Sequence, residues 1–190
     1  MIVGDPTKFA IESEITRAYE NLSLLALGFF VVHIAGQCYG MREPDASALG
    51  VSFDQVGKRI ARRGSHTPPF SMNANAAVIA SSFKRACYDE SVKGELFFGM
   101  PLRQFTEAIY SNHLHWVSDE EFDDSSYVLQ FEDENQVRLV AFTGTSDFRY
   151  DPVSLRDVSL SQNEFYWILK VWHNRFKEEW VSLPKVSSSF

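Results

Sequence analysis

The longest apolar run in the chain, Leu22–Ala35, is the feature that most constrains its fold. It spans fourteen residues, whereas a membrane-spanning helix needs about 20 consecutive apolar residues. The part from Leu24 to Ile34, rich in Phe and Val, is typical of a strand covered on both faces. We therefore expect a central strand of a folded core here, and no membrane partner.

Two neighbouring segments predict partners for this central strand. Phe9–Thr16 alternates apolar and polar residues with the period of two that favours a half-buried strand. On the other side, a turn at Ala35–Gln37 leads to a short strand at Cys38–Tyr39. The three segments together predict an antiparallel meander.

The period of two returns in the C-terminal half of the chain. Tyr127–Phe131 and Val137–Phe142 flank the polar stretch Glu132–Asn135, a pattern typical of a hairpin. A further strand is expected near Leu155–Leu160.

Amphipathic helices are expected between and after these strands, because apolar residues there recur at helical spacing. Their expected start signals are Ser52 and Asn73 as N-caps, Pro101 in a first turn, and a capping box from Ser161 to Glu164. The last helix carries an apolar stripe from Phe165 to Phe176, and Trp167 and Trp180 lie off this stripe as candidates for exposed contact residues.

No repeat and no long linker interrupts the chain, so we expect one domain over residues 1–190 with a frayed tail at 181–190. The predicted class is α+β, with antiparallel sheets from the N- and C-terminal strands packed against amphipathic helices. The residues expected to share a core are Phe30, Val32, Ile34, Phe165, Leu169 and Trp172.

The net charge of −7 comes entirely from one half of the sequence. Residues 1–95 hold ten basic and ten acidic side chains, whereas residues 96–190 hold eight basic and fifteen acidic ones. Within that half, Asp119–Glu134 contains eight acids and no base. Binding to nucleic acid needs clustered Lys and Arg, so we expect no nucleic-acid partner and a basic protein partner instead.

This acidic segment has two possible interpretations, a solvated loop or a surface that meets a cationic partner. Phe122 lies among the acids, and an apolar side chain within a charged border is typical of a binding surface. The candidate partner-binding residues are Asp119, Glu120, Glu121, Phe122, Asp123, Asp124, Glu132, Asp133 and Glu134.

The sequence predicts no catalytic residues, no metal and no cofactor. His113 and His115 lack a third metal ligand at a definite spacing, and no Gly-x-Ser-x-Gly, phosphate-binding or dinucleotide-binding motif occurs. Cys38 and Cys87 have no metal-binding spacing, so we expect reduced thiols and a cytoplasmic location.

The first twelve residues, Met1–Glu12, resemble the N-terminal signature of the immunity protein 42 family of bacterial polymorphic toxin systems. Phe29–Tyr39 is similar to the hydrophobic strand and turn of that family, with Ala35 where Asn is usual. Ser47–Ile60, Val128–Val140 and Val158–Tyr166 are compatible with its later elements, whereas residues 65–125 do not align.

The resemblance implies a cytoplasmic immunity protein that is not an enzyme, and we expect it to be a monomer or a weak dimer. Its partner would be the C-terminal domain of a cognate toxin, a nuclease or other enzyme used in contact-dependent growth inhibition, which it would neutralise by occluding the active site. No toxin-facing residue can be transferred from the family. Two other classes remain open at this point, a small hydrolase-like cytosolic enzyme and a structural or adaptor subunit.

Overall fold

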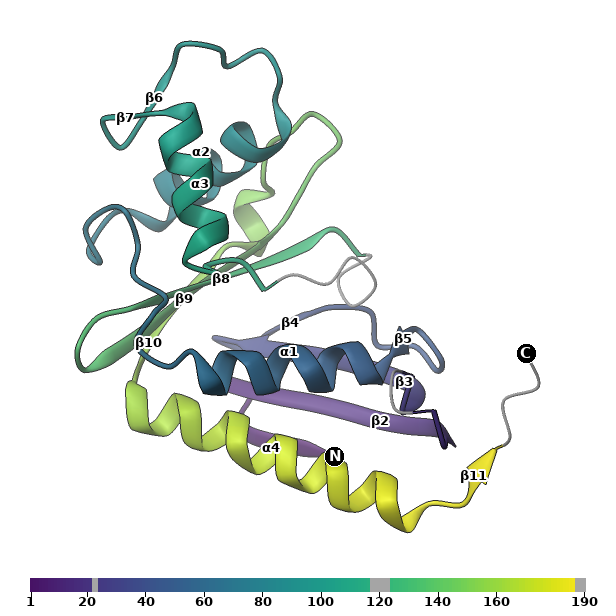
Figure 1. The fold of residues 1–190 in the computed structure, drawn as a ribbon. Helices are drawn as coiled ribbons and strands as arrows, with labels where there is room; N and C mark the ends of the chain where they lie inside the picture. Colours follow the sequence, from purple (N-terminus) through teal and green to yellow (C-terminus); the bar gives the residue numbers. More distant parts are fainter. Residues whose placement is uncertain (22–23, 117–123, 187–190) are drawn as a thin grey trace. The chain divides into compact units, whose positions relative to one another are not determined.

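The computed structural model describes residues 1–21, 24–116 and 124–186 (Figure 1). These residues form two compact units. The first unit comprises the described residues of 1–63, 124 and 163–186, and the second comprises 64–116 and 125–162. The expected organisation as a single domain stays a prediction.

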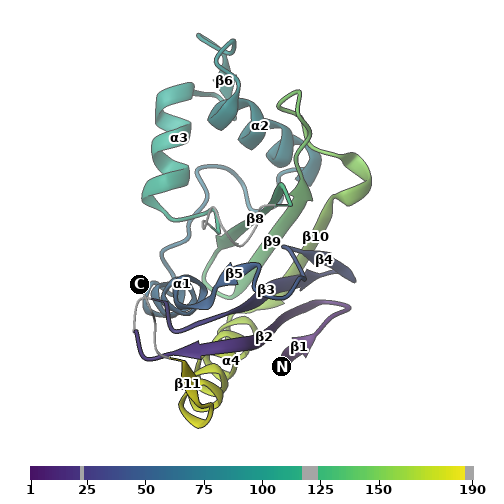
Figure 2. The same cartoon turned by 90° about the vertical axis from the view of Figure 1, so that its right-hand side faces the viewer.

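The first unit is built on a sheet in which β3 lies between β2 and β4 (Figure 2). Its antiparallel strands, in spatial order, are β1 (Ile2–Asp5), β2 (Phe9–Tyr19), β3 (Ala26–Ile34) and β4 (Gln37–Tyr39). Two short strands are added, β5 (Ser47–Ala48) beside β3 and β11 (Lys185–Val186) beside β2. Side chains on both faces of β3 are buried, and only two of its residues are half-buried. The interpretation of the apolar run as a central strand is therefore confirmed.

Helices α1 (Leu49–Ala61) and α4 (Gln162–Ser182) lie along one face of this sheet (Figures 1 and 2). The Trp172 ring of α4 meets Phe30 of β3 edge to face, with ring centroids 5.1 Å apart, and its Nε1 donates to Ser13 Oγ over 3.0 Å. Phe53 of α1 lies 5.5 Å from Phe176 of α4 between ring centroids. All six residues predicted to share the core are buried.

The second unit contains a three-stranded antiparallel sheet in the order β10-β9-β8. The strands are β8 (Ser126–Glu132), β9 (Gln136–Thr143) and β10 (Arg156–Ser161). The other elements of this unit are α2 (Ala76–Tyr88), α3 (Leu102–Ser111), the small hairpin β6 (Leu96–Phe97) with β7 (Met100–Pro101), and a 3-10 turn, Pro152–Ser154. The two helices and the strands β8, β9 and β10 were expected from the sequence, whereas the small hairpin of β6 and β7 was not.

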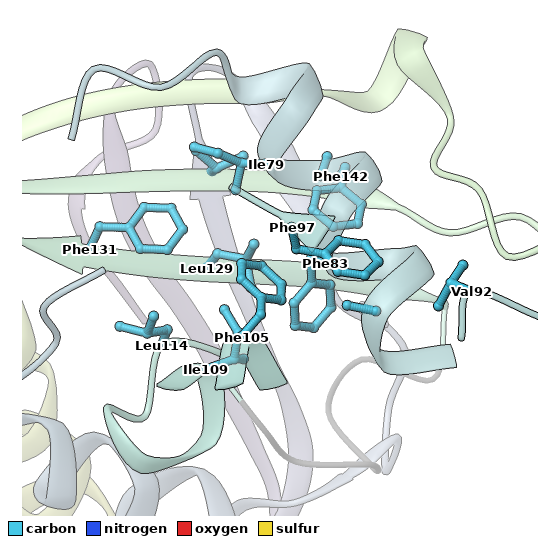
Figure 3. Packing of buried hydrophobic residues seen from close by; sticks show 13 residues of the cluster. Ile79, Phe83, Val92, Phe97, Phe105, Ile109, Leu114, Leu129, Phe131 and Phe142 are labelled. Carbon is cyan, nitrogen blue, oxygen red and sulfur yellow. The ribbon is translucent and has the colours of Figure 1, made fainter. Parts of the chain in front are cut away.

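The core of the second unit consists largely of aromatic and branched side chains from α2, α3, β8 and β9 (Figure 3). Phe83 of α2 and Phe105 of α3 are buried together with Leu129, Phe131 and other residues of the two strands. The α+β class, with antiparallel sheets packed against amphipathic helices, is therefore confirmed.

Besides Pro101, which is the N-cap of α3 and does not lie in its first turn, three element boundaries differ from those expected. Helix α1 begins at Leu49 and includes Ser52, which is buried inside the helix and therefore does not cap it. Asn75, rather than Asn73, caps α2, because its side chain accepts hydrogen bonds from Ala77 N and Val78 N.

The third difference is at the C-terminal end, where a frayed tail was expected from Val181. Helix α4 continues to Ser182, and Lys185–Val186 pairs in parallel with Ala18–Tyr19 of β2. Trp180 helps to fix this end, since its Nε1 donates to Tyr19 O and Leu25 O. Residues 187–190 lie outside the described residues.

Candidate functional site

The acidic residues proposed from the sequence fall into three groups. Four acids, Asp119, Glu120, Glu121 and Asp123, lie outside the described residues, and so does Phe122 among them. Asp124 is exposed in the first unit, where its Oδ2 accepts from Gly40 N over 3.1 Å. The remaining group is Glu132–Glu134, at the end of β8 in the second unit.

Asp133 and Glu134 are exposed in the turn between β8 and β9. Asp133 Oδ1 accepts from Asn135 N and Gln136 N, each over 2.9 Å, which closes the turn. Gln162 holds it from outside, because its backbone N donates to Asn135 O and its Nε2 donates to Asp133 O. The turn is therefore fixed by hydrogen bonds on two sides while its two acidic side chains face solvent.

Glu132 differs from these two neighbours because it is only 2% exposed. One carboxylate oxygen accepts from Gly64 N over 2.5 Å, and the other accepts from Gln130 Nε2 over 2.7 Å and lies 3.1 Å from His66 Nδ1. A buried carboxylate needs such partners, since leaving it unpaired would cost several kcal/mol, on the order of 3–5. Glu132 is therefore buried and hydrogen-bonded inside the second unit, unlike the two exposed acids that follow it.

A groove of about 570 Å³ lies beside the acidic turn. We call it the β8–β9 groove; its lining residues are Gly64, Thr67, Pro68, Phe70, Met72, Glu132, Asp133, Glu134 and Gln162. Its lining combines apolar residues, which we call its apolar side, with the acidic turn. This combination of an apolar surface and a charged border is the composition that protein-binding sites use.

The apolar side of the β8–β9 groove is held in place by the core of the second unit. The Phe70 ring stacks on Phe98 at 4.4 Å and meets Phe131 edge to face at 5.2 Å. Arg138 fixes the following backbone by donating to Met72 O and Ala74 O. Its guanidinium also forms a bidentate ion pair with Asp157, over 2.8 and 2.7 Å, so its charge is paired within the second unit.

The sequence did not point to the apolar side of this groove. Thr67, Pro68, Phe70 and Met72 lie in a stretch with neither helical nor strand periodicity, between two expected helices. The only signal in this stretch is the pair of prolines at 68 and 69, a pattern typical of a break between helices.

His33 is paired with a carboxylate, and the two cysteine thiols are partly buried. His33 Nε2 lies 2.9 Å from Glu12 Oε2, and Arg42 donates to the other oxygen of that carboxylate over 2.6 Å. Burial raises the pKa of the Cys38 thiol, with Glu12 adding to the effect. Burial also raises the pKa of Cys87 to about 11. Both cysteines are therefore protonated, weak nucleophiles at neutral pH.

The two histidines near α3 lie in different surroundings. His113 has a φ of +50° and is exposed after the helix, whereas His115 bridges to Leu129 and stacks on Tyr127 at 5.7 Å. Among the described residues, no group of three or more His, Cys, Asp or Glu side chains could hold a metal ion. Within the same residues, no helix is both long and apolar enough to span a membrane.

The fold is of the α+β class, and the β8–β9 groove is its candidate binding site. The sequence model of the family described as immunity protein 42 matches residues 1–175, and the chain belongs to that family. It is an immunity protein, whose role is to neutralise a cognate toxin and not to catalyse a reaction. The resemblance noted in the sequence is thereby confirmed, and the enzyme and adaptor interpretations give way.

A solved structure gives a second comparison. The crystal structure of CdiI from Burkholderia dolosa has a similar fold, with a TM-score of 0.57 and 15% sequence identity. The similarity covers 92% of this chain and 99% of that chain. No curated protein sequence matches the chain.

Proposed function

We propose that this immunity protein binds the C-terminal domain of its cognate toxin and occludes the active site, with exposed acids forming the charged border of the interface. The observation that supports the proposal is the position of Asp133 and Glu134, which face solvent on a fixed turn beside an apolar groove. Asp119–Asp124 is proposed as a second acidic contact segment, on its sequence composition and the exposure of Asp124.

The chemistry of this surface favours a basic toxin. A cleft that binds an anionic substrate, as in nucleases, presents Lys and Arg, and acids placed opposite them speed encounter and fix orientation. The apolar side of the β8–β9 groove would exclude water from the contact, which strengthens the interaction of the charges at its border. The protein would act in the cytoplasm as a monomer or weak dimer, without a metal, a cofactor, nucleic acid or a membrane.

Co-expression tests the proposed function directly. In polymorphic toxin systems the immunity gene is expected immediately downstream of its toxin gene, so the C-terminal domain encoded directly upstream is the toxin to use. We expect cells producing this domain to survive only with the immunity protein present, and the two chains to co-purify. Cell death despite a soluble, abundant immunity protein would contradict the proposal.

One variant links protection to the groove. Thr67 is exposed at the groove, and Thr67→Arg would place a bulky cation beside the acidic turn. We expect it to weaken binding of the toxin domain at least tenfold. The matched control is Thr7→Arg, which adds the same side chain at a site in the first unit and should bind as the parent does.

A further inference from the structure

The segment between β9 and β10, which we call the 144–151 arm, is closed by its own hydrogen bonds. Gly144 and Tyr150 form an antiparallel bridge, and Thr145 N donates to Arg149 O over 2.9 Å. At its base, Asp151 N donates to Thr143 O over 2.8 Å. These bonds cross from one side of the arm to the other, so the residues at its tip are held in one conformation.

At the tip of this arm lies an aromatic residue in an unfavourable backbone conformation. Phe148 has a φ of +60°, a region that costs free energy for any residue with a Cβ and none for glycine. Its side chain is 48% exposed. Within the described part of the chain, no other aromatic ring contacts that of Phe148.

Phe98, at the turn between β6 and β7, shows what normally compensates such a conformation. Its φ is +51°, and its ring stacks on Phe70 at 4.4 Å and on Phe105 at 5.9 Å. The packing of the Phe98 ring thus repays its backbone cost inside the protein. The ring of Phe148 gains no such packing, although glycine at this position would fold with less strain.

We infer that Phe148 is a contact residue for the cognate toxin, inserted into an apolar pocket of that domain. Strained residues gather at functional positions, and aromatic side chains dominate the binding free energy of protein interfaces. A ring held on a fixed arm loses little conformational entropy when it is buried. The inference rests on the proposed function, since it names a second part of the surface that meets the toxin.

The charged residues beside Phe148 indicate the chemistry of the toxin pocket that would receive it. Asp147 Oδ2 and Arg149 Nε lie 3.3 Å apart, and both side chains are exposed. Thr145 Oγ1 also donates to Asp147, which together with Arg149 lowers the pKa of that carboxyl. The complementary pocket is therefore apolar, large enough for a phenyl ring, and bordered by one hydrogen-bond donor and one acceptor.

Replacing each phenylalanine by glycine separates strain from function. Phe148→Gly should leave the melting temperature unchanged or higher, because it removes backbone strain and, among the described residues, no contact with another aromatic ring. Phe98→Gly should lower it, because the stacking on Phe70 and Phe105 is lost. The toxin domain encoded directly upstream should bind the Phe148→Gly variant at least tenfold more weakly than the parent chain, as measured by calorimetry.

Leu96→Ala is the control for loss of an exposed apolar side chain, since Leu96 is also exposed in the second unit. It should bind the toxin domain as the parent chain does. If the parent binds and Phe148→Gly binds equally well, the inference is overturned and the proposed function stands. The inference is also overturned if Phe148→Gly melts several degrees lower, because Phe148 would then stabilise the arm. If the parent itself does not bind, both fail.

Discussion

Glu132 and its two neighbours, Asp133 and Glu134, are consecutive acids with opposite surroundings. Glu132 is the last residue of β8, where its carboxylate is buried against Gly64, Gln130 and His66. Asp133 and Glu134 follow in the turn and face solvent. Adjacent acids in a run of like charges can therefore have different roles. At the end of a strand, one residue can be buried and the next exposed.

The same comparison separates stability from binding. Glu132 should matter for folding and not for meeting a partner, whereas Glu134 and the charge of Asp133 should matter for the partner and little for folding. Surface charges with few internal contacts usually change stability by about 0.5 kcal/mol or less.

The largest effect is expected at Glu132. Glu132→Ala leaves His66, Gln130 and the Gly64 amide without their shared acceptor, and should lower the free energy of unfolding by about 3–5 kcal/mol. Urea unfolding of the purified variant measures this. Glu134→Ala is the matched control and should change stability by less than about 0.5 kcal/mol. Equal effects of the two variants would remove the distinction between them.

The apolar stripe of α4 offers the same contrast between buried and exposed side chains. Leu169 is fully buried, whereas Trp167 on the same helix is 60% exposed. Leu169→Ala should destabilise the protein by about 2–5 kcal/mol in denaturant unfolding. Trp167→Ala should cost far less despite removing a larger side chain. A loss below about 0.5 kcal/mol for Leu169→Ala would show that α4 presents a different face to the sheet.

A variant of the other acidic segment should change rates and not stability. Replacing Asp119, Glu120, Asp123 and Asp124 by Asn or Gln should slow association with the toxin domain about tenfold at low salt, because long-range attraction speeds encounter. Stopped-flow mixing measures this rate, and the melting temperature should stay near that of the parent. An unchanged rate would identify the segment as a solvated loop.

The smallest expected effect is a pH dependence from His173 in the first unit. Its ring stacks on Phe53 with centroids 3.8 Å apart, and burial, followed by Lys177, lowers the pKa of this imidazole. The unfolded chain therefore binds a proton more readily than the folded one, so stability should decline as pH falls below about 6.5. His173→Gln should flatten this decline in unfolding experiments between pH 7 and 5, which is roughly the range over which histidine titrates. An identical pH profile for both proteins would exclude His173 as the cause.

The elements with regular periodicity were predictable from the sequence, and those fixed by distant contacts were not. The doubly buried β3 and the β8–β9 hairpin follow from apolar pattern alone. Strands β5 and β11 have two residues each, too few to show a period, and depend on pairing with β3 and β2. The start of α1 could not be located because Ala48, its N-cap, makes no side-chain cap.

The candidate site was predictable in part for the same reason. The acids of the β8–β9 turn are visible as a run of charges, but the burial of Glu132 depends on His66, which lies 66 residues away in the sequence. The apolar side of the groove depends likewise on Arg138, whose hydrogen bonds to Met72 O and Ala74 O hold that backbone in place. Sequence pattern records local periodicity, whereas these contacts arise only after the chain has folded.

The salt dependence of association shows whether the exposed acids of the β8–β9 turn meet the toxin. Asp133→Asn with Glu134→Gln removes both charges, while the Asn oxygen can still accept the bonds that close the turn. The control, Glu90→Gln with Glu178→Gln, makes the same change of net charge at exposed sites elsewhere.

We predict that the Asp133→Asn, Glu134→Gln variant associates with the toxin domain about threefold or more slowly than the parent chain at low salt. The difference should largely vanish at about 0.5 M salt, where the screening length falls below about 5 Å. The control variant should follow the parent at every salt concentration. Equal rates and equal salt dependence for the parent and the turn variant would contradict the claim and place the interface elsewhere on the molecule.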